Sequence, residues 1–399
     1  MTPHVDWPAI RRGFHVPEGL CYLDGNSLGL ASDAAEAALE SALLQWKRLA
    51  IRGWTEADPS WLTLSRKVAA RCAPIVGADP ASVIACGSTT SNLHQLLATR
   101  FHATADRRKI VVDSVAFPTD AYVVDSHLRQ RGLDPATHAI RVESRDGLTL
   151  DSGDIVTALS RPGVAIAVLP AVIYTSGQLL DLAHIQNEVK RLDVRVIWDC
   201  SHAAGSVPLD LDASGADAAV WCGYKYLNGG PGCVAFAYLN RRHFAEEPGL
   251  AGWFASSDDA LFAMPPELRP AADARRLQMG TPHVLSLAPL LGSVATVADI
   301  GIGAIRQRSL ELTTLLIEQI DATLPDFEIV TPRDPSQRGG HVTVRHPAAR
   351  RIVQQLTAEN VITDFREPDL VRIAPVALYN DEDDVHRVVT SLRDHARSL

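Results

Sequence analysis

The chain has 399 residues, of which 46% are hydrophobic and 21% are charged, and its 38 Lys and Arg against 47 Asp and Glu give a net charge of −9. This length predicts two to three domains, or one large domain with a satellite, and the composition excludes disordered and collagen-like chains. The acidic balance argues against a nucleic-acid partner, and the longest apolar run, residues 164–174, is far shorter than the roughly 20 residues of a membrane helix.

Short β-branched runs alternate with helical stretches between residues 70 and 240. The expected strands cover residues 82–85, 109–112, 138–142, 165–169, 194–198, 218–221 and 233–238, and the last two are close enough to form a hairpin-like pair. Apolar runs on both sides of intervening helices, such as 181–192, are typical of a sheet that is buried on both faces. The pattern therefore predicts an α/β fold with a mainly parallel, mixed sheet between helices.

The pattern changes after Pro282. A long helical stretch is expected over 285–324, followed by short strands at 327–330, 341–345, 361–364 and 371–373 among helices. A final helix follows Asn380, with acidic residues at 381–384 and with Arg393 and Arg397 late in the helix, as the helix dipole favours. We predict an N-terminal segment over 1–45 that packs with the small domain, a large domain over 46–284 that contains the sheet, and a small α+β domain over 285–399.

The cysteines and histidines follow no metal-binding or disulfide pattern. The six cysteines include no Cys-x-x-Cys pair, and the fourteen histidines include no His-Glu-x-x-His arrangement. We therefore expect reduced thiols and no metal site. Residues 1–12 contain two prolines and lack a continuous apolar stretch, so we expect no secretory signal and a cytoplasmic protein without a membrane partner.

Two side chains at predicted strand ends carry the strongest chemical signal. Asp199 directly follows a predicted buried strand, at the edge where open α/β sheets bind ligands, and a carboxylate there can keep a pyridine nitrogen protonated. Lys225 lies between Tyr224 and Tyr226, and apolar surroundings would free its amine for Schiff-base chemistry. Alone, Asp199 is an ordinary cap and Lys225 an ordinary surface charge. Together they indicate an enzyme that uses pyridoxal 5′-phosphate (PLP).

Two further segments fit the same cofactor. Residues 86–92, C-G-S-T-T-S-N, leave a strand through a glycine and enter a helix, so that backbone N–H groups and hydroxyls converge on one anion. Serine and threonine are also the usual caps of any helix. The segment 117–120, F-P-T-D, offers an aromatic ring that can stack on a flat cofactor and a carboxylate that can face its heteroatoms, although by itself it is an ordinary proline turn.

With these sites in register, the chain resembles the kynureninase family over nearly its whole length. These PLP enzymes belong to the class V aminotransferase group and have the aspartate-aminotransferase-like fold type I. The matching segments are Y-L-D-G-N-S-L-G at 22–29, N-L-H at 92–94, S-G-Q at 176–178, W-C-G-Y-K-Y-L-N-G-G-P-G at 221–232, G-W-F at 252–254, G-T-P at 280–282 and R-I-A-P at 372–375.

The resemblance implies a role for each matched residue. Lys225 would bond the cofactor covalently, Asp199 would pair with its pyridine nitrogen and His202 would lie beside it. Further cofactor contacts are implied for Phe117, Pro118, Thr119 and Asp120 at the ring, for Thr89, Thr90 and Tyr224 at the phosphate, and for Trp253 and Thr281 from the second subunit of a homodimer. Arg372 would hold the substrate α-carboxylate with its two-pronged guanidinium, and Asn26, Ser27 and Trp54 would also contact the substrate. A core position is the alternative for Trp54, and a structural ion pair with an aspartate or glutamate is the alternative for Arg372.

The implied reaction is the hydrolysis of the Cβ–Cγ bond of L-kynurenine to anthranilate and L-alanine, in tryptophan catabolism and NAD biosynthesis. Lys225 would move the Cα proton, and Tyr224 is the candidate for proton transfer at the carbonyl. The chain departs from some family members at Ala255, Ser256 and Thr281, close to the substrate ring in the family. The choice between kynurenine and 3-hydroxykynurenine therefore stays open.

Other PLP activities are the alternatives. A cysteine desulfurase needs a reactive thiol in the C-terminal part of the chain, and no cysteine follows Cys233, which argues against that activity. An aminotransferase would share Lys225 and Asp199, so transfer of an amino group to a keto acid is the test that separates it. A catalytically silent PLP-binding or partner-binding protein on the same fold is the alternative from outside the enzymes.

Overall fold

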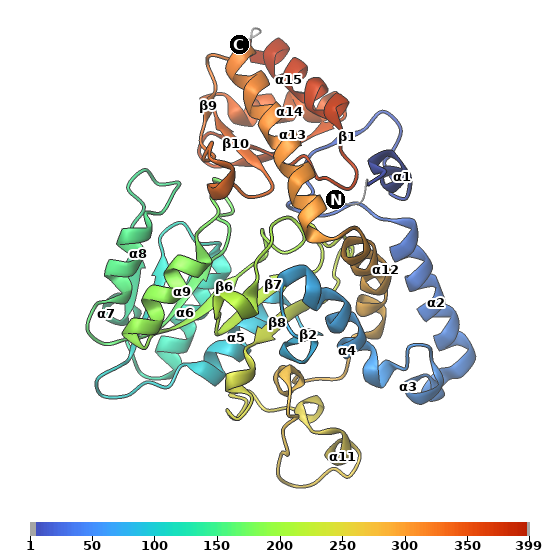
Figure 1. The fold of residues 1–399 in the computed structure, drawn as a ribbon, viewed down its shortest axis with the longest axis vertical. Coiled ribbons are helices and arrows are strands. Elements are labelled where there is room, and N and C mark those ends of the chain that lie inside the picture. Colours follow the sequence, from blue (N-terminus) through green and yellow to red (C-terminus); the bar gives the residue numbers. More distant parts are fainter. Residues whose placement is uncertain (1–4, 397–399) are drawn as a thin grey trace.

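A seven-stranded sheet forms the centre of the larger part of the molecule, in the computed structural model that describes residues 5–396 (Figure 1). Its strand order is β2-β8-β7-β6-β5-β3-β4, and only β8 runs antiparallel to its neighbours. The strands are β2 (Val83–Cys86), β3 (Lys109–Asp113), β4 (Ala139–Val142), β5 (Val164–Pro170), β6 (Arg195–Asp199), β7 (Ala218–Cys222) and β8 (Ala235–Leu239). The predicted mixed, mainly parallel sheet and its hairpin-like last pair are confirmed.

Helices cover both faces of this sheet. On β5, Ile166 and Val168 point into one hydrophobic cluster, whereas Ala167 and Leu169 point into another, as the two-residue period of a strand requires. The first cluster includes side chains of α5 (Thr89–Arg100) and α6 (Pro118–Gln130), and the second includes side chains of α8 (Ser152–Leu159) and α9 (Leu182–Leu192). Short helices α7 (Pro135–His138) and α10 (Leu211–Ser214) lie between these elements in the chain.

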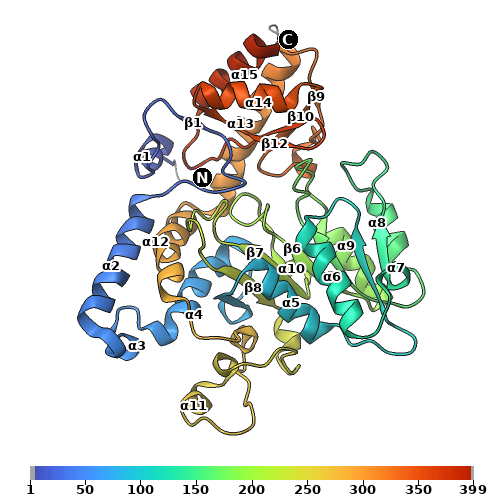
Figure 2. The ribbon, with the colours of Figure 1, turned by 180° about the vertical axis from the view of Figure 1, so that it is seen from behind.

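The N-terminal part joins the two halves of the molecule. It contains α1 (Trp7–Arg12), β1 (Cys21–Tyr22), α2 (Asp33–Leu49), α3 (Gly53–Glu56) and α4 (Trp61–Cys72). Strand β1 pairs in parallel with β11 (Val361–Ile362) of the C-terminal part, and the two form a separate two-stranded sheet. Helix α2 packs against α12 (Val284–Ile300). The loop that carries α11 (Asp258–Leu261) projects at the end of the molecule opposite the small domain (Figures 1 and 2).

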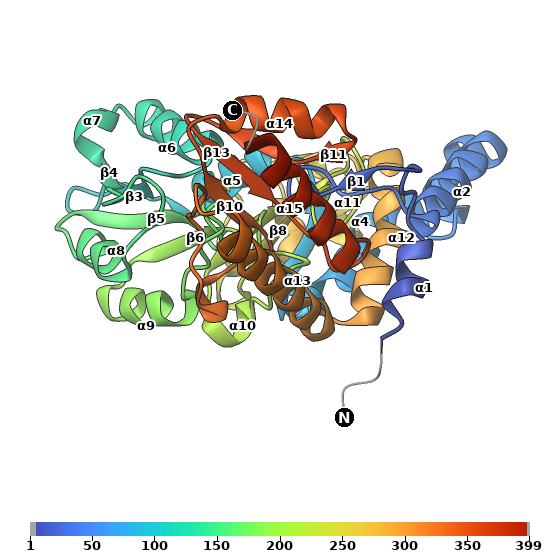
Figure 3. The same cartoon turned by 90° about the horizontal axis from the view of Figure 1, so that it is seen from above.

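A second hydrophobic core lies in the C-terminal part. Its antiparallel sheet has the order β12-β13-β10-β9, formed by β9 (Glu328–Ile329), β10 (Val342–Arg345), β12 (Asp364–Arg366) and β13 (Leu370–Ile373). Helices α13 (Ile302–Thr323), α14 (Ala349–Ala358) and α15 (Glu382–Ala396) complete this part, with α13 beside α15 (Figure 3). This arrangement agrees with the expected small α+β unit.

Two sequence-based predictions are wrong in detail. The single helical stretch expected over 285–324 is divided at Gly301, whose φ of 88° is a left-handed conformation that suits glycine, and α12 and α13 meet at 81°. The strand expected over 361–364 ends at Ile362, and Asp364 begins β12 in the other sheet. Arg397, expected in the last turn of the final helix, lies outside the described residues.

The predicted domain bounds stay a prediction. The packing of α12 and α13 indicates where the boundary between the large and the small domain lies. Leu287, Leu290 and Val294 of α12 lie in the core of the large sheet. In α13, Ile305 still belongs to that core, whereas Leu312 belongs to the second one. The packing therefore favours a boundary within α13. Within residues 5–396 no single helix is long and apolar enough to cross a membrane, although the bent pair α12 and α13 together would reach that length and composition.

Candidate active site

The predicted chemical residues converge at the carboxyl ends of the parallel strands. Asp199 is the last residue of β6, and Lys225 follows the adjacent strand β7. Asp113 ends β3, and Phe117 and Asp120 follow it at the start of α6. Because these strands are parallel, their carboxyl ends meet at one edge of the sheet, where open α/β sheets bind their ligands.

Lys225 contacts a histidine and an aromatic ring. Its Nζ lies 2.8 Å from Nε2 of His202 and 5.9 Å from the ring centroid of Phe117. Burial, followed by the charge of Lys225, lowers the pKa of His202 well below its usual value. His202 is therefore neutral, and its Nε2 accepts a hydrogen bond from the lysine. Its Nδ1 is buried without a hydrogen-bond partner.

Three acidic residues, Asp113, Asp120 and Asp199, interact with one another at this edge, and Asp120 also interacts with the charge of Lys225. Burial raises the pKa of Asp113 to about 7, and burial together with the charges of Asp199 and Asp113 raises the pKa of Asp120 well above its usual value. Both carboxylate oxygens of Asp120 are buried without a hydrogen-bond partner, whereas Asp199 accepts a 2.8 Å hydrogen bond from the backbone N–H of Ser201. The crowding of acidic groups raises the pKa of Asp120, and a ligand with a protonated ring nitrogen would supply the positive charge that these groups lack.

A small cavity, nearly filled by the side chains around it, lies among these groups. Its lining includes Phe117, Asp120, Tyr174, Asp199 and His202. The rings of Phe117 and Tyr174 meet edge to face, with centroids 5.4 Å apart. The cavity therefore has aromatic walls and two acidic side chains, as a flat and partly cationic ring requires.

The predicted phosphate segment forms the N-terminus of α5. Ser88 caps the helix and exchanges hydrogen bonds with Ser91 in a capping box. Oγ1 of Thr89 is buried without a partner, and Oγ1 of Thr90 lies 3.3 Å from Oγ1 of Thr119. Thr119 follows Pro118, the first residue of α6, so the N-termini of two helices lie side by side and both favour an anion.

The loop at residues 24–29 lies against the lysine segment. Gly29 donates a 2.7 Å hydrogen bond to the carbonyl of Tyr224, and a Cβ on Gly29 would come within 2.4 Å of the carbonyl oxygen of Lys225. Asn26 is fully buried, and neither atom of its amide has a partner. Burial also raises the pKa of the half-buried Tyr224 above its usual value, which keeps the phenol protonated.

Arg372 lies on β13, close to this loop. Its side chain is 1% exposed and donates to the carbonyl of Tyr174 at 2.7 Å and to Oγ of Ser27 at 3.0 Å. It also forms an ion pair with Asp364. The structure therefore brings Arg372 and Ser27 together, and it adds an acidic partner on the adjacent strand.

Three predicted residues lie elsewhere. Trp54 packs against Trp61 and Phe254, and Trp253 packs against Phe254 and Phe262, so that these rings form one aromatic cluster around the α11 loop. Trp253 donates its indole N–H to the carbonyl of Leu261 at 2.8 Å. Thr281 is exposed. None of these three has a described contact with Lys225 or its neighbours within the same chain.

Sequence reasoning missed four residues of the site. Tyr174 and His341 lie next to His202, with ring centroids 6.4 and 5.7 Å away, and Arg366 and Asp364 accompany Arg372. His341 is fully buried, and neither ring nitrogen has a partner. Because a buried arginine requires an acidic partner, the sequence indicated that Arg372 could pair with an aspartate or glutamate, but it did not indicate which one. The histidine contact depends on tertiary packing and has no signal in the local sequence.

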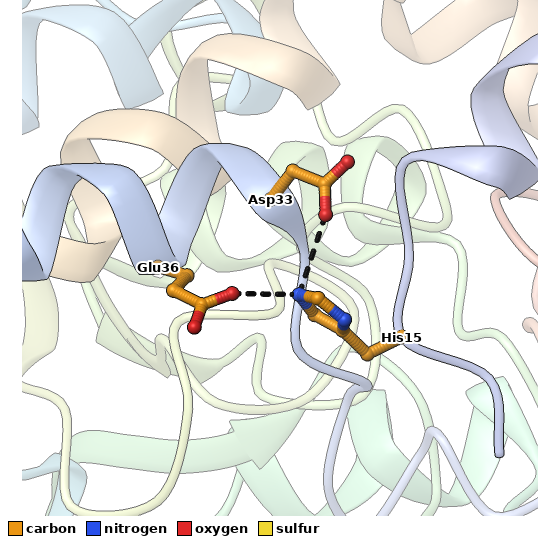
Figure 4. Close-up of side chains that lie close together, drawn as sticks. All are labelled: His15, Asp33 and Glu36. Carbon is orange, nitrogen blue, oxygen red and sulfur yellow. Dashed lines mark ion pairs between the residues drawn. The ribbon is translucent and has the colours of Figure 1, made fainter.

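One group of ligand-type side chains lies apart from this site. Within the described residues, His15, Asp33 and Glu36 place their ligand atoms within 4.8 Å of one another (Figure 4). Nε2 of His15 is 2.8 Å from Glu36 and 3.3 Å from Asp33, and all three side chains are exposed. The acidic pair is in the first turn of α2, where the helix dipole favours negative charge, so the group is explained as surface ion pairs.

Comparisons with known proteins agree on one family. Residues 305–392 match the family model of the kynureninase C-terminal domain. A kynureninase from Geobacillus thermodenitrificans is 46% identical over 385 residues, which cover 96% of this chain and 90% of that protein. The chain belongs to the kynureninase family. A kynureninase from Bacillus cereus is 45% identical over 392 residues, which cover 98% of this chain and 91% of the relative.

Solved structures share the fold of this family member. A cysteine desulfurase from Thermococcus onnurineus has a TM-score of 0.84 at 17% identity, and it covers the full length of both chains. A variant of C-DES with glycine covalently linked to its PLP cofactor has a TM-score of 0.83 at 19% identity, covering 96% of this chain and 99% of that one. At such identities the likeness concerns the fold alone, which is that of PLP enzymes.

Proposed function

We propose that this protein hydrolyses the Cβ–Cγ bond of L-kynurenine to give anthranilate and L-alanine. Membership of the kynureninase family makes PLP the cofactor and an amino acid the substrate class. The observation that carries the proposal is the contact of Lys225 with His202 at a pocket that Asp120 and Asp199 also line, because this arrangement fits a covalently held pyridine cofactor. We also expect the protein to act in the cytoplasm.

The residues present fit the cofactor at each of its polar ends. Asp199 and Asp120 would face the ring nitrogen and the polar edge of the ring, and the unpartnered oxygens of Asp120 support this assignment. The unpartnered Oγ1 of Thr89 would bind the phosphate at the N-terminus of α5. When it is bound, PLP supplies the electron sink that lets bonds at Cα and Cβ break.

The chain's own groups would carry the proton transfers. Lys225 is the group that removes and returns the proton at Cα, and His202 accepts a hydrogen bond that fixes the direction of its amine. Tyr224, protonated near neutral pH, is the donor for the substrate carbonyl oxygen. Arg372 would hold the α-carboxylate, with Ser27 and Asn26 beside it.

We also propose that two copies of the chain complete the site as a homodimer. The aromatic cluster at the α11 loop supports this, because Trp253 is 43%, Phe262 58% and Met264 65% exposed on a projecting segment. On α2, Leu44 and Trp46 are also more than half exposed. Sedimentation of the holoenzyme would give one species of twice the chain mass, and a monomer at micromolar concentration would refute the assembly.

The proposed reaction is tested by product analysis. Holoenzyme is incubated with L-kynurenine, with 3-hydroxy-L-kynurenine, and with each substrate plus a 2-keto acid, and Lys225→Ala serves as the inactive control. We expect alanine and the matching aryl acid in equal amounts without the keto acid. Amino transfer to the keto acid without C–C cleavage would identify an aminotransferase. Cofactor binding without any turnover would identify a silent PLP-binding protein.

A further inference from the structure

The guanidinium of Arg372 already forms an ion pair with the carboxylate of Asp364 in the structure. The two residues lie directly opposite each other on the antiparallel strands β12 and β13. Oδ2 of Asp364 forms the ion pair with Nη2 of Arg372, the same nitrogen that donates to Ser27. Nη1 is bound to the carbonyl of Tyr174, and Nε is buried without a partner. A ligand carboxylate that needs two parallel N–H groups of Arg372 therefore meets a competitor.

The same oxygen of Asp364 binds a second guanidinium. Nε of Arg366 lies 2.9 Å and its Nη2 2.8 Å from Oδ2. Arg366 is 35% exposed and Arg372 is 1% exposed, and Asp364 between them is 16% exposed. Both guanidinium groups lie near the ring of Tyr174, with Cζ 5.8 and 6.0 Å from its centroid. One carboxylate is thus shared between a buried and a half-exposed arginine.

We propose that the carboxylate of Asp364 occupies the place of the substrate carboxylate on Arg372 in the free enzyme. When the substrate binds Arg372, Asp364 pairs with Arg366 instead. The proposal rests on the proposed role of Arg372. A buried guanidinium without a counter-charge is costly, so Asp364 neutralises Arg372 in the free enzyme. Once the substrate provides that charge, Arg366 neutralises Asp364. Neither state then leaves an unpaired ion, and the exchange sets the substrate affinity.

Opposite effects of two substitutions test this exchange. Asp364→Asn keeps the shape and removes the competing charge, so KM for L-kynurenine should fall by about threefold or more with little change in kcat. Arg366→Gln removes the second guanidinium, so that Asp364 can pair only with Arg372 and competes more strongly with the substrate. KM should therefore rise by about threefold or more. The double variant should have the low KM of Asp364→Asn, since residue 364 no longer competes for Arg372. A salt bridge with only a structural role would change KM in the same direction in both single variants, or in neither.

A matched control lies on the same sheet. Arg345 and Glu328 form a cross-strand ion pair at 2.9 Å on β10 and β9, away from Arg372. Glu328→Gln should therefore leave KM unchanged. If Asp364→Asn does not fold, Arg366→Gln decides the question, because a lower melting temperature with unchanged KM would overturn the proposal.

The outcome for Arg372 separates this proposal from the one on which it rests. If Arg372→Lys leaves KM unchanged, the carboxylate role of Arg372 fails, and the exchange fails with it. If Arg372→Lys raises KM while Asp364→Asn does not lower it, only the exchange is refuted. Where turnover of kynurenine is not detected, the dissociation constant of L-alanine, followed by the absorption of the bound cofactor, replaces KM with the same expected directions.

Discussion

Replacing Arg372 with lysine separates substrate binding from structural support. The guanidinium holds three partners at once, the Tyr174 carbonyl, the Ser27 hydroxyl and the Asp364 carboxylate, whereas a lysine presents its donors from a single nitrogen. Loss of one charge-assisted hydrogen bond to the substrate carboxylate, about 1.5–3 kcal/mol, raises KM by roughly 10- to 150-fold. Lysine keeps the charge beside Asp364 but loses at least one hydrogen bond of the guanidinium to Tyr174 or Ser27, worth about 1.5–3 kcal/mol to folding, so the melting temperature should fall by several degrees.

Steady-state kinetics and thermal unfolding of the same Arg372→Lys preparation give both quantities. Cofactor affinity, measured by absorption titration, should equal that of the parent protein, because Arg372 has no proposed contact with PLP. An unchanged KM together with a lowered melting temperature would refute the carboxylate role and leave only the ion pair with Asp364.

Three further predictions concern the cofactor site. Asp199→Asn should bind PLP but lose most activity, about tenfold for each 1.4 kcal/mol of lost stabilisation, and near-normal kcat would remove Asp199 from its role. Thr89→Val should weaken PLP binding in absorption titrations while leaving the cofactor-free protein at least as stable, because it removes a buried hydroxyl without a partner; unchanged affinity would contradict the phosphate role. For Asp113, the raised pKa of about 7 means that the folded state keeps a proton that the unfolded state loses, so stability falls as pH rises from about 4 to 7. Denaturant titrations of cofactor-free Asp113→Asn should lack this component, up to about 4 kcal/mol, and a parallel pH profile would show that the Asp113 pKa is not raised.

Local sequence patterns were sufficient for the large sheet and for part of the site. The β-branched runs indicated its strands because a sheet buried on both faces needs apolar residues at every position. Asp199, Lys225 and Phe117 follow the ends of parallel strands, and the topology alone brings such positions together. The division of the long helix at Gly301 was missed because the helical pattern continues on both sides of it.

Contacts between distant segments could not be predicted in the same way. His341 approaches His202 through packing of the small domain on the large one, and Tyr174 approaches it from the segment after β5 within the large domain. Neither residue has a local motif. Asp364 was not identified as the partner of Arg372 because residues 361–364 were expected as one strand. In the structure Asp364 belongs to β12, and the pairing of β12 with β13 sets it opposite Arg372.

Covalent labelling tests the central assignment, that Lys225 holds the cofactor. The chain has five lysines, Lys47, Lys67, Lys109, Lys190 and Lys225, so each can be assigned after borohydride reduction and peptide mapping. The pyridoxyl label should appear on Lys225 alone and be absent from Lys225→Ala, with Lys190→Ala labelled as the parent protein is. A label on any of the other four lysines, or labelling of Lys225→Ala equal to that of the parent, would contradict the assignment.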